Sequence, residues 1–473
     1  MRFRWDQTFP PEYGRCKPPP AWLYLTIFVV LLCIFAGGAV LTWPKGKPVD
    51  AEVFLRIALA LPVMLSLVVG LLVFLAGHDH PAYAAAIRNS ARWELLKEWR
   101  RQAHSRDAVL DSVVVAPEPD LAERMLKLEG SPPENPGKVM RLENVVAADD
   151  RSRRQVMVEK LLAPLLPKLA QAIGSDSFDI VLQCDDEEPS ADVLAAWRQL
   201  ELPGTPRIRR IDNDTHPEVA CIWFEDESHP YMDLTPKYRL VLAWHLHDAT
   251  QEAPPTVSEA AVALLLGMPR LMQAKPDTKR QAWLLRQIVS DADRMDRSLA
   301  LLLRAEQVSS EHIRHFWYAR LKGLARYSTL GAVRDADIEV EEHALDQAIG
   351  PQAPVARWLL AALAAKMAHF GQGGQLVALP HGKGSVMLNL VVREPDPVNL
   401  PWKAEYGFNP APFFEFSFFV SLWCFIMLVL PDKSWGTLQT VTTVVVVVLF
   451  LMSAVWRIFL VRLYSRQIWN QYG

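Results

Sequence analysis

The sequence contains few cysteines, and its net charge is small. Five cysteines occur in 473 residues, and two of them, Cys33 and Cys424, lie inside apolar stretches. Because no CxxC pair is present, the sequence argues against a disulfide framework and suits a reducing compartment. The net charge of −3 provides no broad basic field, so we expect no nucleic-acid partner.

The short motifs that identify common enzymes are also missing. The segment His381–Gly384 contains a Gly-Lys pair but lacks the earlier glycine of a phosphate-binding loop, and it precedes a predicted strand rather than a helix. We interpret it as a turn. No GxGxxG, GxSxG or HExxH pattern occurs. The sequence therefore predicts no bound cofactor, and an enzymatic role is the less favoured interpretation.

Charge is nearly absent from four apolar runs near the two ends of the chain. Crossing the hydrocarbon core of a bilayer takes about 20 apolar residues at about 1.5 Å of rise each. A signal peptide is the alternative for the first run, but that run is long for one and a second run follows closely. We predict four transmembrane helices in two hairpins: Ala21–Trp43, Phe54–Ala76, Phe413–Leu430 and Thr437–Leu460.

Positively charged residues set the predicted orientation. Gly77–Pro81 is interpreted as the turn out of the membrane, and a basic helix follows it. Spans that end in clusters of lysine and arginine end on the cytoplasmic side. We therefore predict a bacterial inner-membrane protein with both termini and the middle of the chain in the cytoplasm. The basic side chains expected to face anionic headgroups, unless they form only the solvated face of a linker helix, are Arg88, Arg92, Lys97, Arg100 and Arg101.

Two opposite charges fall within the last predicted hairpin. Glu415 lies near the inner start of its span and Arg457 near the inner end of its own, so the two have a similar depth. Charges inside a membrane are usually paired or functional, and we predict an ion pair between these two. The alternative is that each reaches the headgroups alone. A transport role is disfavoured because so few charges line the spans.

The middle of the chain has the pattern of a folded soluble domain. Strands are predicted at Ala108–Ala116, Ile180–Leu182, Arg207–Asp212, Val219–Phe224 and Tyr238–Leu246. Helices are predicted at Asp120–Glu129, Arg151–Ile173 and Ser190–Leu200, and this alternation argues for a layered α/β domain. From Asp277 to Val333 the apolar spacing, which includes Trp283 and Trp317, predicts mainly helices. A further helix at Ala353–His369 and a strand pair at Leu376–Pro380 and Val386–Val392 are predicted to follow. The predicted domains are a basic tail (1–20), a first hairpin (21–77), an amphipathic linker helix (78–107), an α/β domain (108–270), a helical subdomain with a terminal strand pair (271–411), a second hairpin (412–464) and a tail (465–473).

A few polar side chains in this middle part are candidates for a site. His245 and His247 share one face of a predicted strand and are candidate metal ligands, but no third ligand is visible, so a structural role is favoured. The acidic run Asp185–Glu188 follows a strand, where α/β active sites often lie, and a solvated loop is the favoured interpretation over a Mg²⁺ site. His312 and His315 are predicted to lie three residues apart on a helix.

Three segments resemble membrane proteins encoded near the VgrG spike and lipase-effector genes of bacterial type VI secretion clusters: Arg106–Ser112, Leu128–Pro132 and Ser258–Leu265. The last segment is also similar to the second half of thiolase-like (β-ketoacyl synthase) folds. Those enzymes need a cysteine at a strand-to-helix turn and two histidines, or a histidine and an asparagine. Cys184 and Cys221 do not have that context here. The resemblance therefore implies a degenerate, non-catalytic fold with an accessory role.

These observations favour an inner-membrane accessory or adaptor protein whose cytosolic domain binds a protein partner. The resemblance suggests a secretion effector or a spike component as that partner. An effector immunity protein and a membrane-bound metal-dependent enzyme are the alternatives, and a channel or transporter comes last. The predicted partners are thus the lipid bilayer and a protein, and the sequence leaves oligomerisation open.

Overall fold

The structure is a computed structural model, and it divides into two compact units. One unit joins Gln7–Glu98 to Asn399–Gly473, and the other joins Arg2–Asp6 to Trp99–Val398. We call them the helical unit and the α/β unit. The predicted strand Val219–Phe224 lies outside the described residues. The described residues are 3–14, 16–44, 46, 48–147, 151–175, 177–185, 189–211, 236–247, 254–275, 278–430 and 434–472.

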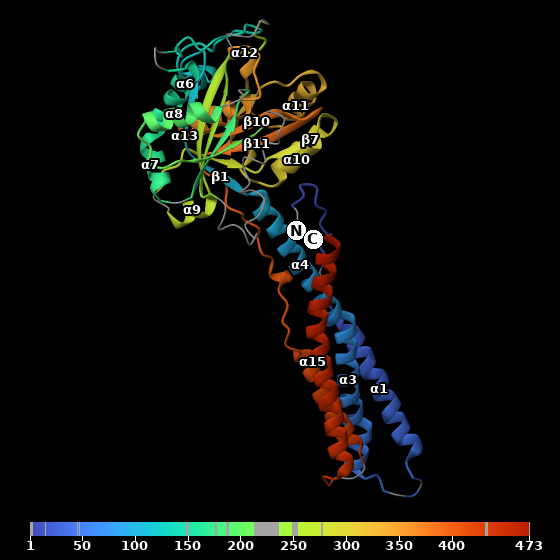
Figure 1. The fold of residues 1–473 in the computed structure, drawn as a ribbon. Coiled ribbons are helices and arrows are strands. Elements are labelled where there is room, and N and C mark those ends of the chain that lie inside the picture. The colour runs from blue at the N-terminus through green and yellow to red at the C-terminus, as the bar shows by residue number, and fades with distance from the viewer. Residues whose placement is uncertain are drawn as a thin grey trace. The chain divides into compact units, whose positions relative to one another are not determined.

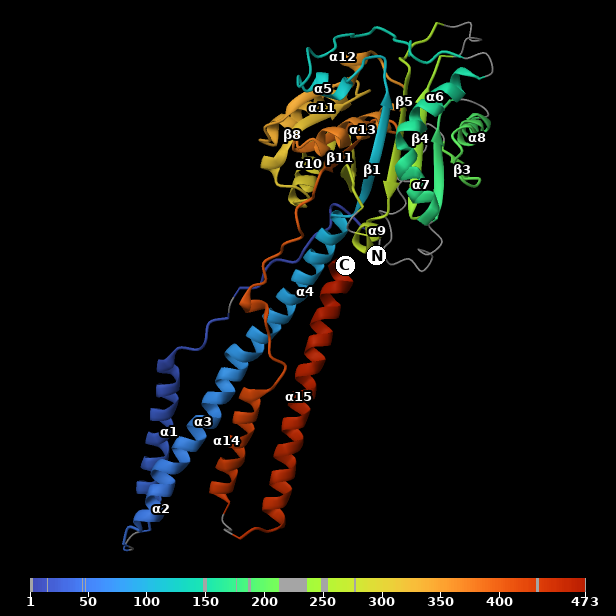
Figure 2. The same ribbon diagram turned by 90° about the vertical axis from the view of Figure 1, so that its left-hand side faces the viewer.

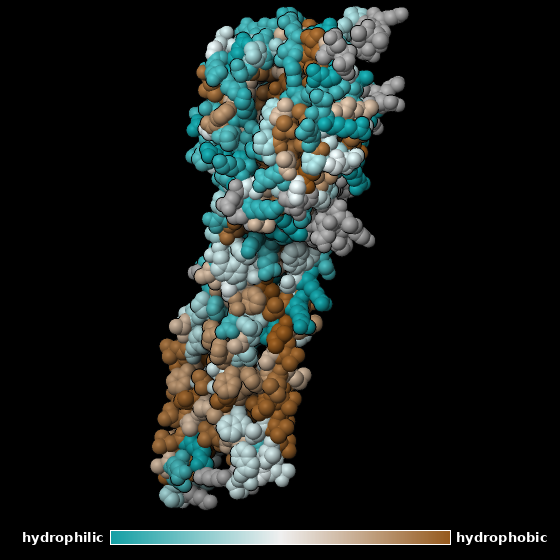
Figure 3. All heavy atoms as spheres, turned by 60° about the vertical axis from the view of Figure 1, so that its left-hand side comes forward, coloured by the Kyte–Doolittle hydropathy of each residue, from teal (hydrophilic) through white to brown (hydrophobic). Residues whose placement is uncertain are grey.

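The helical unit contains the apolar helices from both ends of the chain (Figure 1). Among the described residues, three helices are long and apolar enough to cross a membrane: α1 (Ala21–Thr42), the continuous helix Ala51–Ala103 and α15 (Thr437–Tyr472). The apolar helix α14 (Phe413–Val429) is shorter, at 17 residues. Apolar side chains gather over these helices in Figure 3. The predicted apolar helices are confirmed, whereas four membrane crossings remain a prediction.

The helix Ala51–Ala103 continues through the predicted turn at Gly77–Pro81, so that turn is wrong. Its parts follow one another without a break. They are α2 (Ala51–Leu55), a π-helical segment (Arg56–Ala60), α3 (Leu61–Phe74), a second π-helical segment (Leu75–Asp79) and α4 (His80–Ala103).

Each π-helical segment ends two residues before a proline, Pro62 or Pro81. A proline has no N–H for the helical hydrogen-bond ladder and crowds the turn before it. A wider π turn is one way in which a helix absorbs that defect. The prolines therefore do not end the helix, and most of the predicted linker helix (78–107) is the continuation of the second apolar helix.

The α/β unit is built around one mixed sheet (Figure 2). The order across it is β3-β2-β4-β5-β1-β6-β11-β10-β8-β9, and β7 pairs with β11. This confirms the predicted α/β fold. The strands are β1 (Arg106–Val115), β2 (Phe178–Gln183), β3 (Arg207–Arg210), β4 (Tyr238–His245), β5 (Ala260–Gly267), β6 (Ala282–Leu285), β7 (Ile288–Asp291), β8 (Ile313–Tyr318), β9 (Glu341–Ala344), β10 (Gly374–His381) and β11 (Ser385–Val392).

The two halves of this sheet follow one plan. From the outer edge inward, β3, β2 and β4 are parallel, and β5 is antiparallel to both β4 and β1. In the same way β9, β8 and β10 are parallel, and β11 is antiparallel to both β10 and β6. The halves meet where β1 pairs with β6. Because the strands also come in the same chain order in each half, the α/β unit is an internal repeat.

The helical subdomain predicted at 271–411 is wrong, because this region supplies the second half of the sheet. Trp283 lies in β6 and Trp317 in β8, although both fitted a helical spacing. Strands buried on both faces form short continuous apolar runs, which sequence periodicity cannot separate from a buried helix. The strands alternate with the helices α10 (Met295–Arg304), α11 (Gly323–Asp335) and α13 (Ala356–His369).

Helix α13 joins the two halves into one core. Eleven of its 14 residues are buried, and it packs on β5 and β1 of the first half and on β10, β11 and β6 of the second. Its many alanines let it lie close to the strands, as dense packing of an interior requires. On the first half the sequence predicted most helices correctly: α6 (Arg153–Leu162), α7 (Leu166–Ser175) and α8 (Pro189–Gln199).

Candidate functional site

A buried carboxylate lies between β4 and β5. Glu259 directly precedes β5, and its side chain is fully buried. Arg153, the first residue of α6, places two guanidinium nitrogens 2.6 Å from the two carboxylate oxygens. The backbone N–H groups of Leu142 and His247 donate to the same carboxylate at 2.6 and 2.7 Å. Four separate chain segments therefore meet at Glu259.

These contacts determine the charge state of Glu259. Burial raises the pKa of the carboxyl, but the hydrogen bonds from Arg153 and from the backbone N–H groups of Leu142 and His247 outweigh burial and lower the pKa. Arg153 also donates from Nε to the carbonyl oxygen of Val145 at 2.8 Å. The carboxylate is therefore ionised, and it accepts hydrogen bonds from groups of the protein itself. These hydrogen bonds hold the chain segments together.

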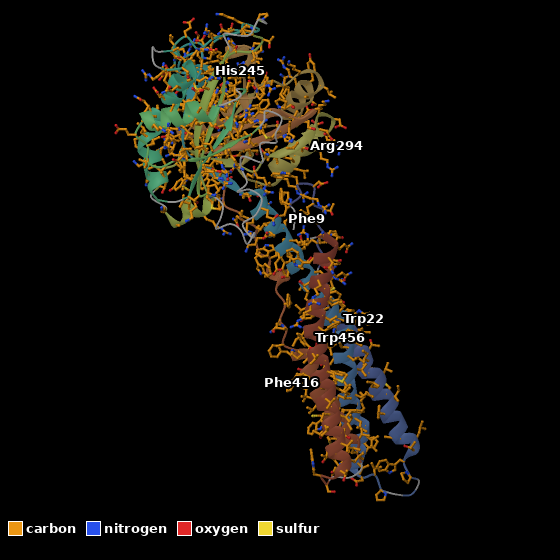
Figure 4. The ribbon with its side chains drawn as sticks, viewed as in Figure 1. Phe9, Trp22, His245, Arg294, Phe416 and Trp456 are labelled. Carbon is orange, nitrogen blue, oxygen red and sulfur yellow. The ribbon has the colours of Figure 1, made fainter. Side chains whose placement is uncertain are left out.

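His245 and His247, the two candidate metal ligands from the sequence, each contact a different protein group. Nδ1 of His245, a residue labelled in Figure 4, lies 2.7 Å from Oδ2 of Asp185. Nε2 of His247 lies 2.8 Å from the carbonyl oxygen of Val257, and its Nδ1 lies 3.6 Å from Glu259. The ring centres of the two histidines are 6.0 Å apart. In the part of the chain that the structure describes, neither belongs to a group of three potential metal ligands.

Of the remaining candidate residues from the sequence, only some lie within the described residues. Cys184 directly follows β2 and is buried, at 3% exposure. The remainder of the acidic run, 186–188, and Cys221 lie outside the described residues.

The prediction that His312 and His315 share a helix is wrong. His312 ends a 3₁₀ turn (Ser310–His312), and His315 lies in β8. The strand brings His315 against His343 of β9, with 3.0 Å between Nδ1 of His315 and Nε2 of His343. Sequence reasoning missed His343, because only the parallel pairing of β8 and β9 makes the two histidines neighbours.

Both rings of this pair are held in the neutral form. Burial lowers the pKa of His315. Burial, and next the charge that His315 would carry, lower the pKa of His343 to about 4. The two imidazoles are therefore neutral at neutral pH.

Helix α11 presents two large apolar side chains to solvent. Leu324 is 67% exposed and Tyr327 is 76% exposed. Residues three apart on a helix are neighbours, so these two form one patch, whereas Thr329 on the same helix is buried. Lys322 and Arg326 beside them are exposed as well. We call Lys322, Leu324, Arg326 and Tyr327 the α11 surface.

In the helical unit, Glu415 and Arg457 are in contact. Nη1 of Arg457 lies 2.6 Å from both oxygens of Glu415 and 3.1 Å from Oδ2 of Asp79. Glu415 and Arg457 are 3% and 5% exposed. Cζ of Arg457 also lies 4.2 Å from the centre of the Tyr83 ring. This cluster links α14, α15 and the helix Ala51–Ala103, and the sequence had not indicated the part of Asp79.

The basic side chains expected at the headgroups differ in their surroundings. Cζ of Arg88 lies 4.3 Å from the centre of the Tyr464 ring, and Nε of Arg92 donates to a backbone carbonyl at 2.8 Å. Arg100 pairs with Glu306 at 2.7 Å. These three are half-buried against protein groups. The two that are exposed are Lys97 and Arg101.

Comparison with known proteins gives a likeness to solved structures only. No family model matches the sequence, and no match was found among curated proteins. The chain is similar to a type II polyketide acyl-carrier protein–ketosynthase complex (12% identity, 61% of this chain and 99% of that chain, TM-score 0.46). It is also similar to an oxazolomycin ketosynthase domain from Streptomyces albus (12%, 63% and 99%, TM-score 0.42) and to a β-ketoacyl synthase from Burkholderia phymatum (9%, 61% and 99%, TM-score 0.43).

These structures are condensing enzymes of the kind that the sequence resembles. With identities of 9–12% and TM-scores below 0.5, the likeness carries no conclusion about activity or ligands. The α/β fold with its large mixed sheet is established here by the strand order of this protein.

Proposed function

We propose that this chain is an inner-membrane accessory or adaptor protein whose α/β unit faces the cytoplasm and binds a protein partner. Apolar helices of membrane-spanning length at both ends of the chain support anchoring in the bilayer. The clusters of lysine and arginine that follow the second apolar stretch support the orientation. In this arrangement the α/β unit is the part of the protein that binds the partner.

The α11 surface is the observation that carries the binding role. Leu324 and Tyr327 form an exposed apolar pair on one helix face, and Lys322 and Arg326, which are also exposed, each lie two positions from Leu324 in the chain. Aromatic side chains dominate the energy of protein interfaces when a partner buries them, and opposite charge at the rim steers the partner. The surface therefore fits a protein segment that is apolar at its centre and acidic around it.

The resemblance to proteins encoded near spike and lipase-effector genes supports a narrower proposal. The partner would be a type VI secretion effector or a spike component that the adaptor holds at the membrane. An effector immunity role uses the same surface, with a toxin as the partner.

Substitution of the α11 surface tests the proposal. The full chain is purified from membranes in detergent as wild type, as Leu324→Ala/Tyr327→Ala and as Phe370→Ala, and the proteins that co-purify are identified. Phe370 is a matched control because it is also a large exposed side chain of the α/β unit, at 56% exposure. We expect one specific partner with wild type and with Phe370→Ala, and its loss with the double variant. Equal recovery by all three proteins, or no specific partner, contradicts the proposal.

A further inference from the structure

Three side chains with metal-binding atoms meet where β8 pairs with β9. His315 lies opposite Glu341, and His343 follows two residues later on the same face of β9. One ligand atom of each residue lies within 4.8 Å of those of the other two. Across the described residues this is the only group of three histidine, cysteine or carboxylate side chains with that geometry.

We propose that His315, Glu341 and His343 bind a divalent transition-metal ion such as Zn²⁺. Two imidazoles and one carboxylate form a ligand set that Zn²⁺ uses in sites where the fourth position is left to water. Imidazole selects Zn²⁺ and its neighbours in the first transition row over Mg²⁺ and Ca²⁺, which prefer oxygen ligands. The inference goes beyond the proposed adaptor role and does not depend on it.

The two nitrogens need only a small adjustment to share an ion. Nδ1 of His315 and Nε2 of His343 are 3.0 Å apart. Tetrahedral bonds of about 2.0–2.1 Å place two ligand nitrogens about 3.3 Å apart. The rings therefore have to separate by about 0.3 Å, which is within the freedom of two side chains on neighbouring strands.

The surroundings of His343 orient its ring for this role. The ring of Trp317 lies 4.7 Å from the His343 ring, centre to centre. Nε1 of Trp317 donates to Oε1 of Gln375 at 2.7 Å, which holds the indole in place.

Lys127 competes with the ion for Glu341. Nζ of Lys127 lies 2.8 Å from Oε1 of Glu341. Because a positive charge next to the carboxylate opposes a divalent cation, removal of Lys127 should strengthen binding. Lys127 has φ +57°, so Asn, which tolerates that conformation, is the suitable replacement.

A bound ion would stabilise the edge of the sheet. β9 is the last strand on its side and pairs only with β8 within the described sheet. Ligands from both strands would fasten β9 to the sheet and protect an exposed edge, which proteins otherwise have to cover or blunt.

Metal titration of the full chain in detergent tests the site. The protein, without a polyhistidine tag, is stripped with a chelator, dialysed and titrated with Zn²⁺, and with Co²⁺ to follow the visible absorption of tetrahedral coordination. We expect one ion per wild-type chain. Glu341→Gln and His343→Gln should each weaken binding more than about 100-fold, since even outer partners of a site are worth about 10- to 100-fold. Lys127→Asn should bind more tightly than wild type.

His312→Ala is the matched control, because this exposed histidine precedes β8 and lies outside the group. It should bind like wild type. Equal affinity of wild type and Glu341→Gln, or no binding by wild type, overturns the proposal. The side chain of Glu341 is 42% exposed, so this variant disturbs the core less than His343→Gln and decides the question even if His343→Gln fails to fold.

Discussion

At the scale of single residues, Glu259 and Arg153 form an ion pair that is shielded from water. The side chain of Glu259 is fully buried, and that of Arg153 is 16% exposed. Breaking a buried pair leaves an uncompensated charge, which costs far more than the intact pair contributes. The pair was missed in the sequence because its two members are 106 positions apart.

Arg153→Met should destabilise the protein by about 3–5 kcal/mol, because Glu259 then stays buried without the two close hydrogen bonds from its nearest cation. Urea unfolding of the full chain in detergent measures this loss. The control is Arg151→Met, two positions earlier, which breaks a pair with Glu159 at 2.7 Å in which the arginine side chain is 40% exposed. Such a pair is worth less than about 1 kcal/mol, so similar losses in both variants would contradict the role assigned to Glu259.

His343 should make stability depend on pH. Its pKa is about 4 in the folded chain, against 6.5 for an ordinary histidine. Between these values the unfolded chain binds a proton that the folded chain does not, so stability falls as the pH drops through this range. The full effect is on the order of 3 kcal/mol.

Urea unfolding at about pH 7 and about pH 5, with a chelator present, measures this dependence. His343→Gln carries no titrating group at this position and should lose part of the difference between the two pH values. An unchanged difference in His343→Gln would show that other groups cause it.

At the scale of elements, the link between α12 (Leu345–Ile349) and the chain that follows depends on one glycine. Gly350 has φ +71°, and a Cβ atom there would collide with the carbonyl oxygen of Lys138. Asn135 holds the same loop against α12, since its N–H donates to the carbonyl oxygen of Gln347 at 2.8 Å. The two segments therefore fit together only without a side chain at 350.

Gly350→Ala should destabilise the α/β unit by more than about 2 kcal/mol, through strain and the collision together. Gly331→Ala is the control, because a Cβ at this position inside α11 meets nothing within 4 Å. Alanine is the better helix former by about 1 kcal/mol, so this variant should gain stability. Thermal unfolding compares the two, and a neutral Gly350→Ala would contradict the close packing.

Elements were predictable where their apolar pattern was long or bounded by clear signals. The helix at 356–369 and the hairpin of β10 and β11 agree with the sequence. Trp283 and Trp317 were assigned to helices because a short strand that is covered on both faces lacks the alternation of apolar and polar residues that identifies a strand. Gly77–Pro81 was assigned to a turn because a proline usually ends a helix, whereas a π turn absorbs this one.

At the scale of the whole molecule, the internal repeat could not be predicted. It depends on strand pairings such as that of β1 with β6, which joins Ala108 to Trp283, 175 positions further along the chain. Nothing in local periodicity encodes such partners. The same limit applies to the candidate sites, since Glu259 with Arg153 and His315 with His343 become neighbours only through the fold.

The orientation of the α/β unit is the claim on which the adaptor proposal depends, and a reporter inserted after Gly204 tests it directly. Gly204 is exposed in the turn between α8 and β3. Green fluorescent protein at this position should fluoresce in living cells, and alkaline phosphatase there should be inactive, because the first works in the cytoplasm and the second only outside it. An active phosphatase with a dark fluorescent fusion would contradict the account.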